Sequence, residues 1–529
     1  MKRLVALALL LALRVHAAAP VPGSAPDAPD APDAPALRVV RLTGHHAVAE
    51  AELQARAAPY LGQPASADTL EALRQDLTRL YVERGYVNSG VLLRAASGDT
   101  VDLQVVEGRL VGVTVRGLER LHPDYVTQRL LRPDDGPLNL DALRARFALL
   151  AADPLFASVQ ARVLPGDRLG EAVLDVSAER ARAWQIGWTL NNYRPVSVGA
   201  AATALTARVF NLSGHGDVLD AALQVPTRHS AEPRISLGWR LPLDAGGRVS
   251  AFVALDHGQS LVTEAPVAAL DIRSRLASAE AGLQLTLTES LNLRASTSLS
   301  VMRRQSRAWL LGIPFAFTAG EPSDGTREHL LRWVHELHLR DPQQALALRS
   351  VLTWGQNNLA PAADLASSGT TAVAQRFFVW QAQAHYTRQL PVRGAQLVLR
   401  AALQRSPQHL LALDAMPVGG VQTVRGFREN TLVRDQALVL NAELEWPVLA
   451  DPDTGVRAWL IPFVDHGRAL QHGAGGATLQ STGLATRAVW NGWQADVAWA
   501  HRLRQPDNTR PSGANLQDRG VHLQLGYRY

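Results

Sequence analysis

The chain ends with Val521–Tyr529 (VHLQLGYRY), a stretch in which apolar and polar side chains alternate without interruption. Alternate residues of a β-strand point to opposite faces, so one face of this strand is entirely apolar. That face carries Val521, Leu523, Leu525, Tyr527 and Tyr529. No further segment follows that could cover it, and such an edge would promote aggregation of a soluble protein. A transmembrane β-barrel places the apolar face in lipid and the polar face in its lumen, so the strand predicts an outer-membrane barrel.

The beginning of the chain predicts export. Lys2 and Arg3 precede the apolar run Leu4–Leu13, and small residues follow at Ala17–Ala19, as in a secretory signal. About ten apolar residues cannot cross about 30 Å of hydrocarbon, which argues against a membrane anchor. We therefore interpret residues 1–17 as a signal peptide. Residues 18–36 contain the repeat PDAPDAPDAP and are interpreted as an extended linker, because closely spaced prolines prevent helix formation.

Composition excludes several kinds of site. The chain has no Cys, so disulfides and thiolate metal sites are excluded. Removal of the signal with Lys2, Arg3 and Arg14 lowers the formal charge from +5 to +2, and Arg is scattered among Asp and Glu, which does not support nucleic-acid binding. Gly214–Gly216 lacks the Lys–Ser/Thr pair of a nucleotide-binding loop. We expect no cofactor and no metal ion.

No catalytic residue is predicted either. The histidines, including His45, His46, His329, His335 and His338, show no Ser–His–acid arrangement and no metal-ligand spacing. We interpret His335, together with the neighbouring Arg and Glu positions, as polar residues that face a barrel lumen. The chain is therefore not expected to be an enzyme.

Residues 37–109 and 110–180 are each predicted to form a small β-α-α-β-β module. In the first, the predicted elements are a strand at Leu37–Thr43, helices at Val48–Tyr60 and Thr69–Arg84, and strands at Tyr86–Leu93 and Thr100–Val106. Asp68 and Glu71 form a capping-box pattern before the second helix. In the second, they are a strand at Leu110–Arg116, helices at Asp124–Leu131 and Asn139–Leu150, and strands at Val159–Val163 and Ala172–Ala178. Each module is expected to leave a sheet edge open.

Residues 184–529 are predicted to form a sixteen-stranded antiparallel barrel. The expected strands begin near Trp184, Ala200, Asp217, Arg234, Arg248, Leu276, Asn292, His329, Ala345, Gln375, Ala395, Gln436, Val456, Ala477, Gly492 and Val521. Short connections alternate with long ones, as in outer-membrane barrels with short periplasmic turns and long surface loops. The longest connection, residues 407–435, follows the eleventh strand and is long enough to fold into the lumen. The overall class is therefore α+β modules followed by a transmembrane β-barrel.

Several motifs resemble the outer-membrane transporters of two-partner secretion, the TpsB class of haemolysin-activator type, which belongs to the superfamily of the BamA insertase. Leu80–Ser89 (LYVERGYVNS) and Val105–Gly108 (VVEG) resemble the first polypeptide-transport-associated (POTRA) domain of that family. Asn211–Asp217 (NLSGHGD) resembles its turn after the second barrel strand. Val424–Phe427 (VRGF) and Pro462–Gly467 (PFVDHG) resemble the tip of its lumen loop and the strand motif that receives the tip.

The resemblance implies a lock inside the barrel. Its loop-tip residues would be Val424, Arg425, Gly426 and Phe427, and its partners on strand thirteen Phe463, Asp465 and Gly467. Arg425 is expected to pair with Asp465. In a water-filled lumen such a pair is expected to contribute about 1 kcal/mol. The resemblance also implies that Tyr529 carries an assembly signal. Members of the family commonly have an N-terminal plug helix, but the proline-rich residues 18–36 make the loop the expected main obstruction.

The leading interpretation is a bacterial outer-membrane transporter whose POTRA domains, in the periplasm, capture an unfolded exoprotein for passage to the cell surface. An extended substrate can add to an open sheet edge. Its side chains are expected to pack in a groove around the second helix, at Leu73, Leu77, Tyr81 and Tyr86. Other expected partners are outer-membrane lipid and the barrel-assembly machinery. The alternatives are a barrel-assembly factor of the BamA type, a passive porin, which would leave the modules unexplained, and a hydrolase.

Overall fold

The computed structural model describes residues 35–132, 135–227, 233–361, 372–509 and 513–529. The predicted signal peptide, residues 1–17, and nearly all of the linker lie outside the described residues. The chain divides into two compact units, one ending at Arg182 and the other spanning Ala183–Tyr529. No helix in the described ranges is long and apolar enough to span a membrane.

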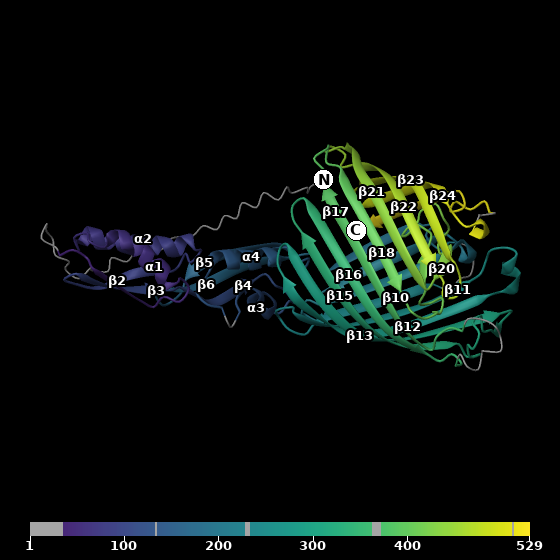
Figure 1. Cartoon of the computed structure of the whole chain (residues 1–529), viewed down its shortest axis with the longest axis horizontal. Coiled ribbons are helices and arrows are strands. Elements are labelled where there is room, and N and C mark those ends of the chain that lie inside the picture. The colour runs from purple at the N-terminus through teal and green to yellow at the C-terminus, as the bar shows by residue number, and fades with distance from the viewer. Residues whose placement is uncertain (1–34, 133–134, 228–232, 362–371, 510–512) are drawn as a thin grey trace. The chain divides into compact units, whose positions relative to one another are not determined.

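The first unit contains two modules, and the first of these has a three-stranded sheet covered by helices (Figure 1). Its elements are β1 (Val39–Thr43), α1 (Glu50–Ala57), the 3-10 turn η1 (Ala58–Tyr60), α2 (Ala67–Glu83), β2 (Gly90–Ser97) and β3 (Thr100–Val106). The strand order is β1-β3-β2, with β1 parallel and β2 antiparallel to β3. The apolar stripe of α2 is buried against this sheet and supplies five residues of the core, more than any other element of the module.

Two local predictions for this module are wrong. Helix α2 is capped by Ser66, whose Oγ accepts from the backbone N–H of Thr69 at 3.3 Å. The expected capping box therefore does not form, and Glu71 instead accepts from Arg74 Nε at 2.7 Å. Strand β2 begins four residues later than predicted, because Gly85 (φ +88°) ends the helix and the following residues turn before pairing starts.

The second module repeats the order of elements. It contains β4 (Arg109–Arg116), α3 (Asp124–Leu130), α4 (Leu140–Ala151), β5 (Phe156–Pro165) and β6 (Glu171–Arg180), with the strand order β4-β6-β5. Asn139 caps α4, since its Oδ1 accepts from the backbone N–H groups of Asp141 and Ala142. The two modules confirm the predicted α+β part of the fold.

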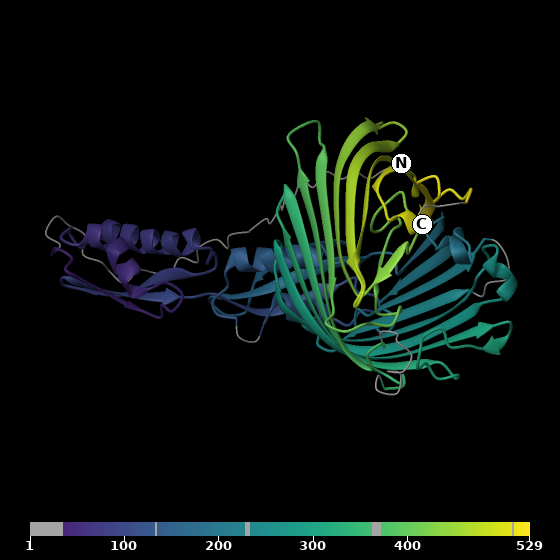
Figure 2. The same ribbon diagram turned by 45° about the vertical axis from the view of Figure 1, so that its right-hand side comes forward.

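The second unit is a closed antiparallel barrel (Figures 1 and 2). Its sixteen wall strands are β7 (Trp184–Asn191), β8 (Ala202–Phe210), β9 (Val218–Pro226), β10 (Arg234–Pro242), β11 (Val249–Leu261), β12 (Arg273–Glu289), β13 (Leu293–Leu310), β15 (Thr326–Arg340), β16 (Gln344–Asn357), β17 (Arg376–Gln389), β18 (Gln396–Arg405), β21 (Gln436–Ala450), β22 (Arg457–Leu470), β23 (Gly476–Trp490), β24 (Trp493–Arg504) and β25 (Val521–Arg528). A short strand β14 (Ile313–Pro314) pairs with the end of β13. Strand β25 pairs with β7 and closes the ring. Every predicted strand start lies within three residues of an observed one, which confirms the predicted barrel.

The two faces of the wall differ in chemistry. Inward-facing side chains form ion pairs between strands, such as Arg332 with Glu280 at 2.9 Å. Outward-facing side chains in the middle of the wall are apolar and exposed, as at Val301 and Val464. His335 lies on the outward face of β15 beside Trp333, with 4.5 Å between ring centroids. The lumen-facing prediction is therefore correct for the neighbouring Arg332 and Glu336, which form ion pairs inside the barrel, and wrong for His335.

Candidate functional site

The connection between β18 and β21 folds into the barrel and forms a small hairpin, β19 (Met416–Val418) with β20 (Leu432–Arg434). Figure 2 shows this segment, in light green, within the ring of strands. A buried apolar cluster fixes it to the wall: Val418, Val424, Phe427 and Leu432 from the loop pack on Ala437, Val439, Ala469 and Leu479. The long connection is therefore the lumen loop that the sequence predicts.

Arg425, at the tip of this loop, binds Asp465 on β22 through three hydrogen bonds. Its Nε donates to Asp465 Oδ2 at 2.8 Å, its Nη2 to Oδ1 at 2.7 Å, and its backbone N–H to Oδ2 at 3.0 Å. Asp465 is 0% exposed and Arg425 is 5% exposed. The contact is thus a bidentate pair shielded from water, a geometry that Lys cannot reproduce.

Further side chains complete a buried network around this pair. Glu443 on β21 accepts from Arg425 Nη1 at 2.9 Å and also pairs with Arg400. Asn441 donates to Asp465 Oδ1 at 2.8 Å and to the carbonyl of Thr423 at 2.5 Å. The Arg425 guanidinium lies 3.5 Å from the ring centroid of Phe463. Two arginines therefore face two carboxylates, and the network is close to neutral.

Burial changes the expected energy of the lock. A value of about 1 kcal/mol applies to a solvated pair and is wrong for a pair with this little exposure. Loss of Arg425 would leave Asp465 buried without a cation, and loss of Asp465 would leave Arg425 to share Glu443 with Arg400. Breaking a buried pair in this way costs about 3–5 kcal/mol. The pair is therefore a strong positional restraint on the loop.

Two glycines of the predicted motifs allow the close approach. Gly426 has φ +88°, and a Cβ there would lie 2.8 Å from Ala500 Cβ. Its N–H donates to His522 Nε2 at 3.1 Å and its carbonyl accepts from Arg502 Nε at 2.5 Å. On the wall, a Cβ at Gly467 would lie 2.6 Å from Val418 and 2.7 Å from Val424. Both positions therefore require the absence of a side chain.

The loop tip is held on its other side as well. Phe427 is 2% exposed, and the Arg502 guanidinium lies 5.5 Å from its ring centroid. Arg428 pairs with Asp518 and donates to Glu264 Oε1 at 2.8 Å. The sequence reasoning missed these partners, and it also missed Glu443 and Asn441. The only available signal was that each is a polar residue on the inward face of a strand or in a loop beside one.

Comparisons with known proteins agree with this arrangement. Residues 170–488 match the family model described as "Haemolysin secretion/activation protein ShlB/FhaC/HecB". The chain belongs to this family. Residues 36–108 match the ShlB-type POTRA domain. As a member of the ShlB/FhaC/HecB family, the chain is a two-partner secretion transporter of the outer membrane, with its POTRA domains in the periplasm.

Individual relatives match different shares of the chain. The outer membrane transporter CdiB of Dickeya dadantii (strain 3937) is 22% identical over 491 residues, which is 88% of this chain and 82% of that protein. The hemolysin transporter protein ShlB of Serratia marcescens is 32% identical over 155 residues, 28% of this chain and 26% of that protein. The solved structure of CdiB from Escherichia coli superposes with a TM-score of 0.70 at 18% identity and covers 96% of this chain and 93% of that one.

The predicted substrate groove of this family member needs correction. Leu73, Leu77 and Tyr81 are each 0% exposed, because they form the core between α2 and its sheet. The Tyr81 hydroxyl donates to Glu107 Oε1 at 3.0 Å. Of the four predicted residues only Tyr86 is partly accessible. The apolar stripe of α2 therefore builds the module and does not line an open groove.

Glu107, in the VVEG motif, has a structural role. Burial alone would raise its pKa, but donation from the backbone N–H groups of His46 and Ala47 and from the Tyr81 hydroxyl keeps the pKa below its ordinary value. Asp217, in the NLSGHGD turn, behaves alike. Burial would raise its pKa, but hydrogen bonds from Ser213 and Trp239 hold it low. Both acidic residues therefore stay ionised and fix loops.

The sheet edges of the two modules are not equivalent. Val91 on the edge strand β2 is covered by α2: its N–H donates to Thr78 Oγ1 at 3.1 Å and its carbonyl accepts from Arg74 at 3.2 Å. On the opposite edge, Gln54 donates to the carbonyl of Val40 at 3.2 Å. Among the described residues of the second module, no helix side chain bonds the backbone of the ten-residue edge strand β5. The more open edge therefore belongs to the second module.

Tyr529 lies beside the beginning of the barrel. Its N–H donates to the carbonyl of Ile186 at 3.0 Å, and its ring stacks on Trp184 with centroids 5.5 Å apart. The last residue therefore joins the first strand and helps to close the ring. No group of three His, Cys, Asp or Glu suited to a metal ion occurs in the described part of the chain.

Proposed function

We propose that this transporter captures an unfolded exoprotein at its periplasmic modules and passes it through the barrel once the lumen loop has left Asp465. The observation that carries the proposal is the buried Arg425–Asp465 pair at the tip of a loop inside the lumen. A noncovalent, nearly neutral lock holds the loop firmly and forms again after each passage. The energy for export would come from folding of the exoprotein at the cell surface.

Capture is assigned to strand β5 of the second module. An extended polypeptide adds to a sheet edge through backbone hydrogen bonds, which tolerates varied side chains. The edge of β2 is a poorer acceptor, because Thr78 and Arg74 already occupy the backbone groups of Val91. A longer, unoccupied edge at β5 gives the substrate more ladder positions.

The lock is tested by crosslinking the loop in place. The chain has no Cys, so Val424→Cys with Gly467→Cys introduces a single pair. A Cβ at position 467 would lie 2.7 Å from a γ-carbon of Val424, which brings a sulfur at 424 within bonding reach. We expect the oxidised double variant to stop exoprotein secretion and a reductant to restore it. The reduced double variant is the control, because it carries the same substitution at Gly467 without the crosslink, and full secretion by the oxidised barrel would refute the proposal.

Capture is tested by photo-crosslinking in the full chain. A photoreactive residue at Gln160 or Arg162, both exposed on β5, should crosslink the exoprotein. The photoreactive residue placed instead at Leu92, beside the covered Val91, should crosslink the exoprotein weakly. Strong crosslinks at Leu92 and none on β5 would assign capture to the first module instead.

The remaining assignments are proposals of the same kind. Residues 1–17 would direct export, residues 18–36 would tether the modules, and Tyr529 would present the assembly signal to the barrel-assembly machinery. Replacement of Tyr529 by Asp should reduce barrel insertion, which heat-modifiable migration in electrophoresis would measure. We also propose that the chain works without catalysis.

A further inference from the structure

A row of polar side chains crosses the outer face of the barrel. Strand register places Arg303 on β13 opposite His329 on β15, His329 opposite Gln356 on β16, and Gln356 opposite Arg376 on β17. All four side chains are exposed. Along its strand, Arg303 lies two residues from Val301 and His329 two residues from Leu331, and both of these apolar residues are exposed on the outer face. Residues two apart in a strand point to the same face. The row therefore points away from the lumen.

An apolar row lies directly beneath it. Val301, Leu331, Trp354 and Phe378 are paired across the same four strands, two residues further along each strand. Trp354 and Phe378 lie 5.5 Å apart by ring centroids, as in an aromatic girdle at the membrane boundary. The chain enters the barrel from the periplasmic modules, so β13 and β16 end at the cell surface and β15 and β17 begin there. The polar row thus lies at headgroup depth in the outer leaflet.

The row is positively charged and has no acidic counterpart on its own face. Above the apolar row, the outward positions of β11–β13 and β15–β17 that the structure describes hold no Asp or Glu. Higher on the same face, Arg307 lies directly opposite Arg275, an unfavourable like-charge pair. Inside the barrel, by contrast, Arg304 pairs with Glu328 and Asp414. In the loops just beyond these strands, Asp271 pairs with Arg273 and Asp324 with Arg327. Arg303 and Arg376 have no such partner among the described residues, so they remain available to negative charge on another molecule.

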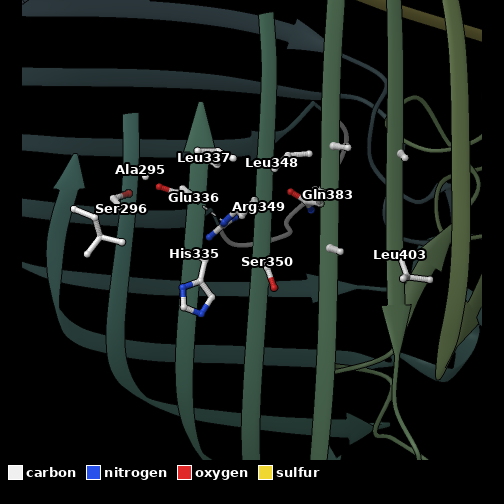
Figure 3. Close-up of a pocket in the computed structure, with 14 residues that line it drawn as sticks. Ala295, Ser296, His335, Glu336, Leu337, Leu348, Arg349, Ser350, Gln383 and Leu403 are labelled. Carbon is white, nitrogen blue, oxygen red and sulfur yellow. Dashed lines mark ion pairs between the residues drawn. The ribbon is translucent and has the colours of Figure 1, made fainter. Parts of the chain in front are cut away.

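Two hollows on these strands fit a lipid. The first, of about 720 Å³, is lined by the whole polar row and by Val301, Leu331 and Trp354 of the apolar row. The second, of about 490 Å³, lies closer to the periplasm, six residues or about 20 Å further along β15. Its floor contains the small side chains of Ala295, Ser350, Ala382, Ala384 and Ala401. Figure 3 shows it, with His335 and Ser350 on neighbouring strands.

We propose that this face binds a phosphate-bearing lipid of the outer leaflet. Arg303 and Arg376 would bind its phosphate groups, with His329 and Gln356 donating between them, because guanidinium groups bind phosphate bidentately. The acyl chains would lie on the apolar row and extend towards the second hollow. Free inorganic phosphate could use only the polar row, so the apolar row and the second hollow favour a lipid.

The test uses the full chain in neutral detergent with bisphosphorylated lipid A as the probe. Native mass spectrometry should show bound lipid A on the wild-type barrel and about a tenfold weaker affinity for the Arg303→Gln/Arg376→Gln variant. Arg468→Gln is the matched control, since Arg468 is also exposed on the outer face but lies on β22. Unchanged heat-modifiable migration will show that each variant is folded.

The ligand's chemistry is tested in the same assay. Lipid A stripped of its phosphates should bind the wild-type barrel as weakly as the double variant binds the intact lipid. Equal binding of lipid A to wild type and double variant, or equal losses in the double variant and Arg468→Gln, would overturn the site. Displacement of lipid A by inorganic phosphate at equal concentration would overturn the choice of a lipid.

Discussion

The inner and outer faces of the same barrel wall use arginine in opposite ways. At the inner face Arg425 of the lumen loop is 5% exposed and reaches both Asp465 and Glu443 of the wall. On the outer face Arg303 and Arg376 are exposed and pair with no acidic residue that the structure describes. A buried charge is tolerated only with a partner inside the protein, whereas a charge at the membrane boundary can find one in water or lipid. The difference shows that paired arginines fix structure and unpaired ones remain available for binding.

The largest expected effect comes from breaking the inner pair. Asp465→Ala leaves Arg425 buried beside a single carboxylate already shared with Arg400, which should destabilise loop docking by about 3–5 kcal/mol. We expect exoprotein secretion to fall, because the loop could not return to its docked position after each passage, while barrel insertion stays intact. Secretion into the medium and heat-modifiable migration measure the two outcomes.

Matched variants make this test specific. Arg468→Ala, three residues along β22 on the outer face, should leave secretion unchanged. Arg425→Ala should resemble Asp465→Ala, and the double variant should be little worse than either single one, because all three remove one interaction. Arg425→Lys should secrete little more exoprotein than Arg425→Ala, because Lys cannot form the bidentate pair. Losses that multiply independently would show that the two residues act separately.

The second expected effect depends on pH. Burial raises the pKa of Glu429 in the lumen loop to about 7, although its Oε1 accepts from the backbone N–H of Val421 at 2.7 Å. A released loop would have an ordinary pKa near 4.5. The docked loop therefore holds the proton more tightly, and docking should weaken by on the order of 2–3 kcal/mol as the pH rises from about 4.5 to about 7. Outside that window Glu429 should add no pH dependence to docking.

A spin label tests this dependence. Placed at Gln422→Cys, which is exposed and unique in a chain without Cys, it should become more mobile between pH 5 and pH 7.5. Glu429→Gln should abolish the change, since it removes the titrating group. The same mobility change in Glu429→Gln would assign the pH dependence to another residue.

The third effect tests packing in place of charge. Gly467→Ala places a methyl group against Val418 and Val424, and such overpacking typically costs about 1–3 kcal/mol. Gly475→Ala is the control, because its Cβ would meet nothing within 4 Å. Protease sensitivity of the lumen loop should rise in the first variant alone. Equal sensitivity in both would show that the loop yields without cost.

The inward position of Asp465 could be predicted because two-residue alternation and the energetic cost of a carboxylate in lipid both assign it to the lumen. Its neighbours could not be predicted. Asn441 reaches Asp465 because these two residues are directly paired across β21 and β22, and strand register is not encoded in either strand alone. The prediction that Leu73 and Tyr81 line a substrate groove was wrong for a related reason. A helical stripe shows which face is apolar but not whether that face meets its own sheet or a substrate.

The smallest predicted effect is a slight gain in barrel stability, and it comes from a substitution on the outer face. Arg307 and Arg275 are directly opposite on β13 and β12, and like charges in that position are unfavourable by about 0.2–1 kcal/mol. Arg307→Gln should therefore stabilise the barrel slightly in neutral detergent. Arg332→Gln on the inner face should destabilise it, because Glu280 would lose its ion pair. The midpoint of heat-modifiable unfolding measures both changes. Added lipid A should cancel the gain in stability from Arg307→Gln, since bound phosphate neutralises the like-charge pair in the wild-type barrel. If both variants destabilise the barrel, the outer arginines already have partners.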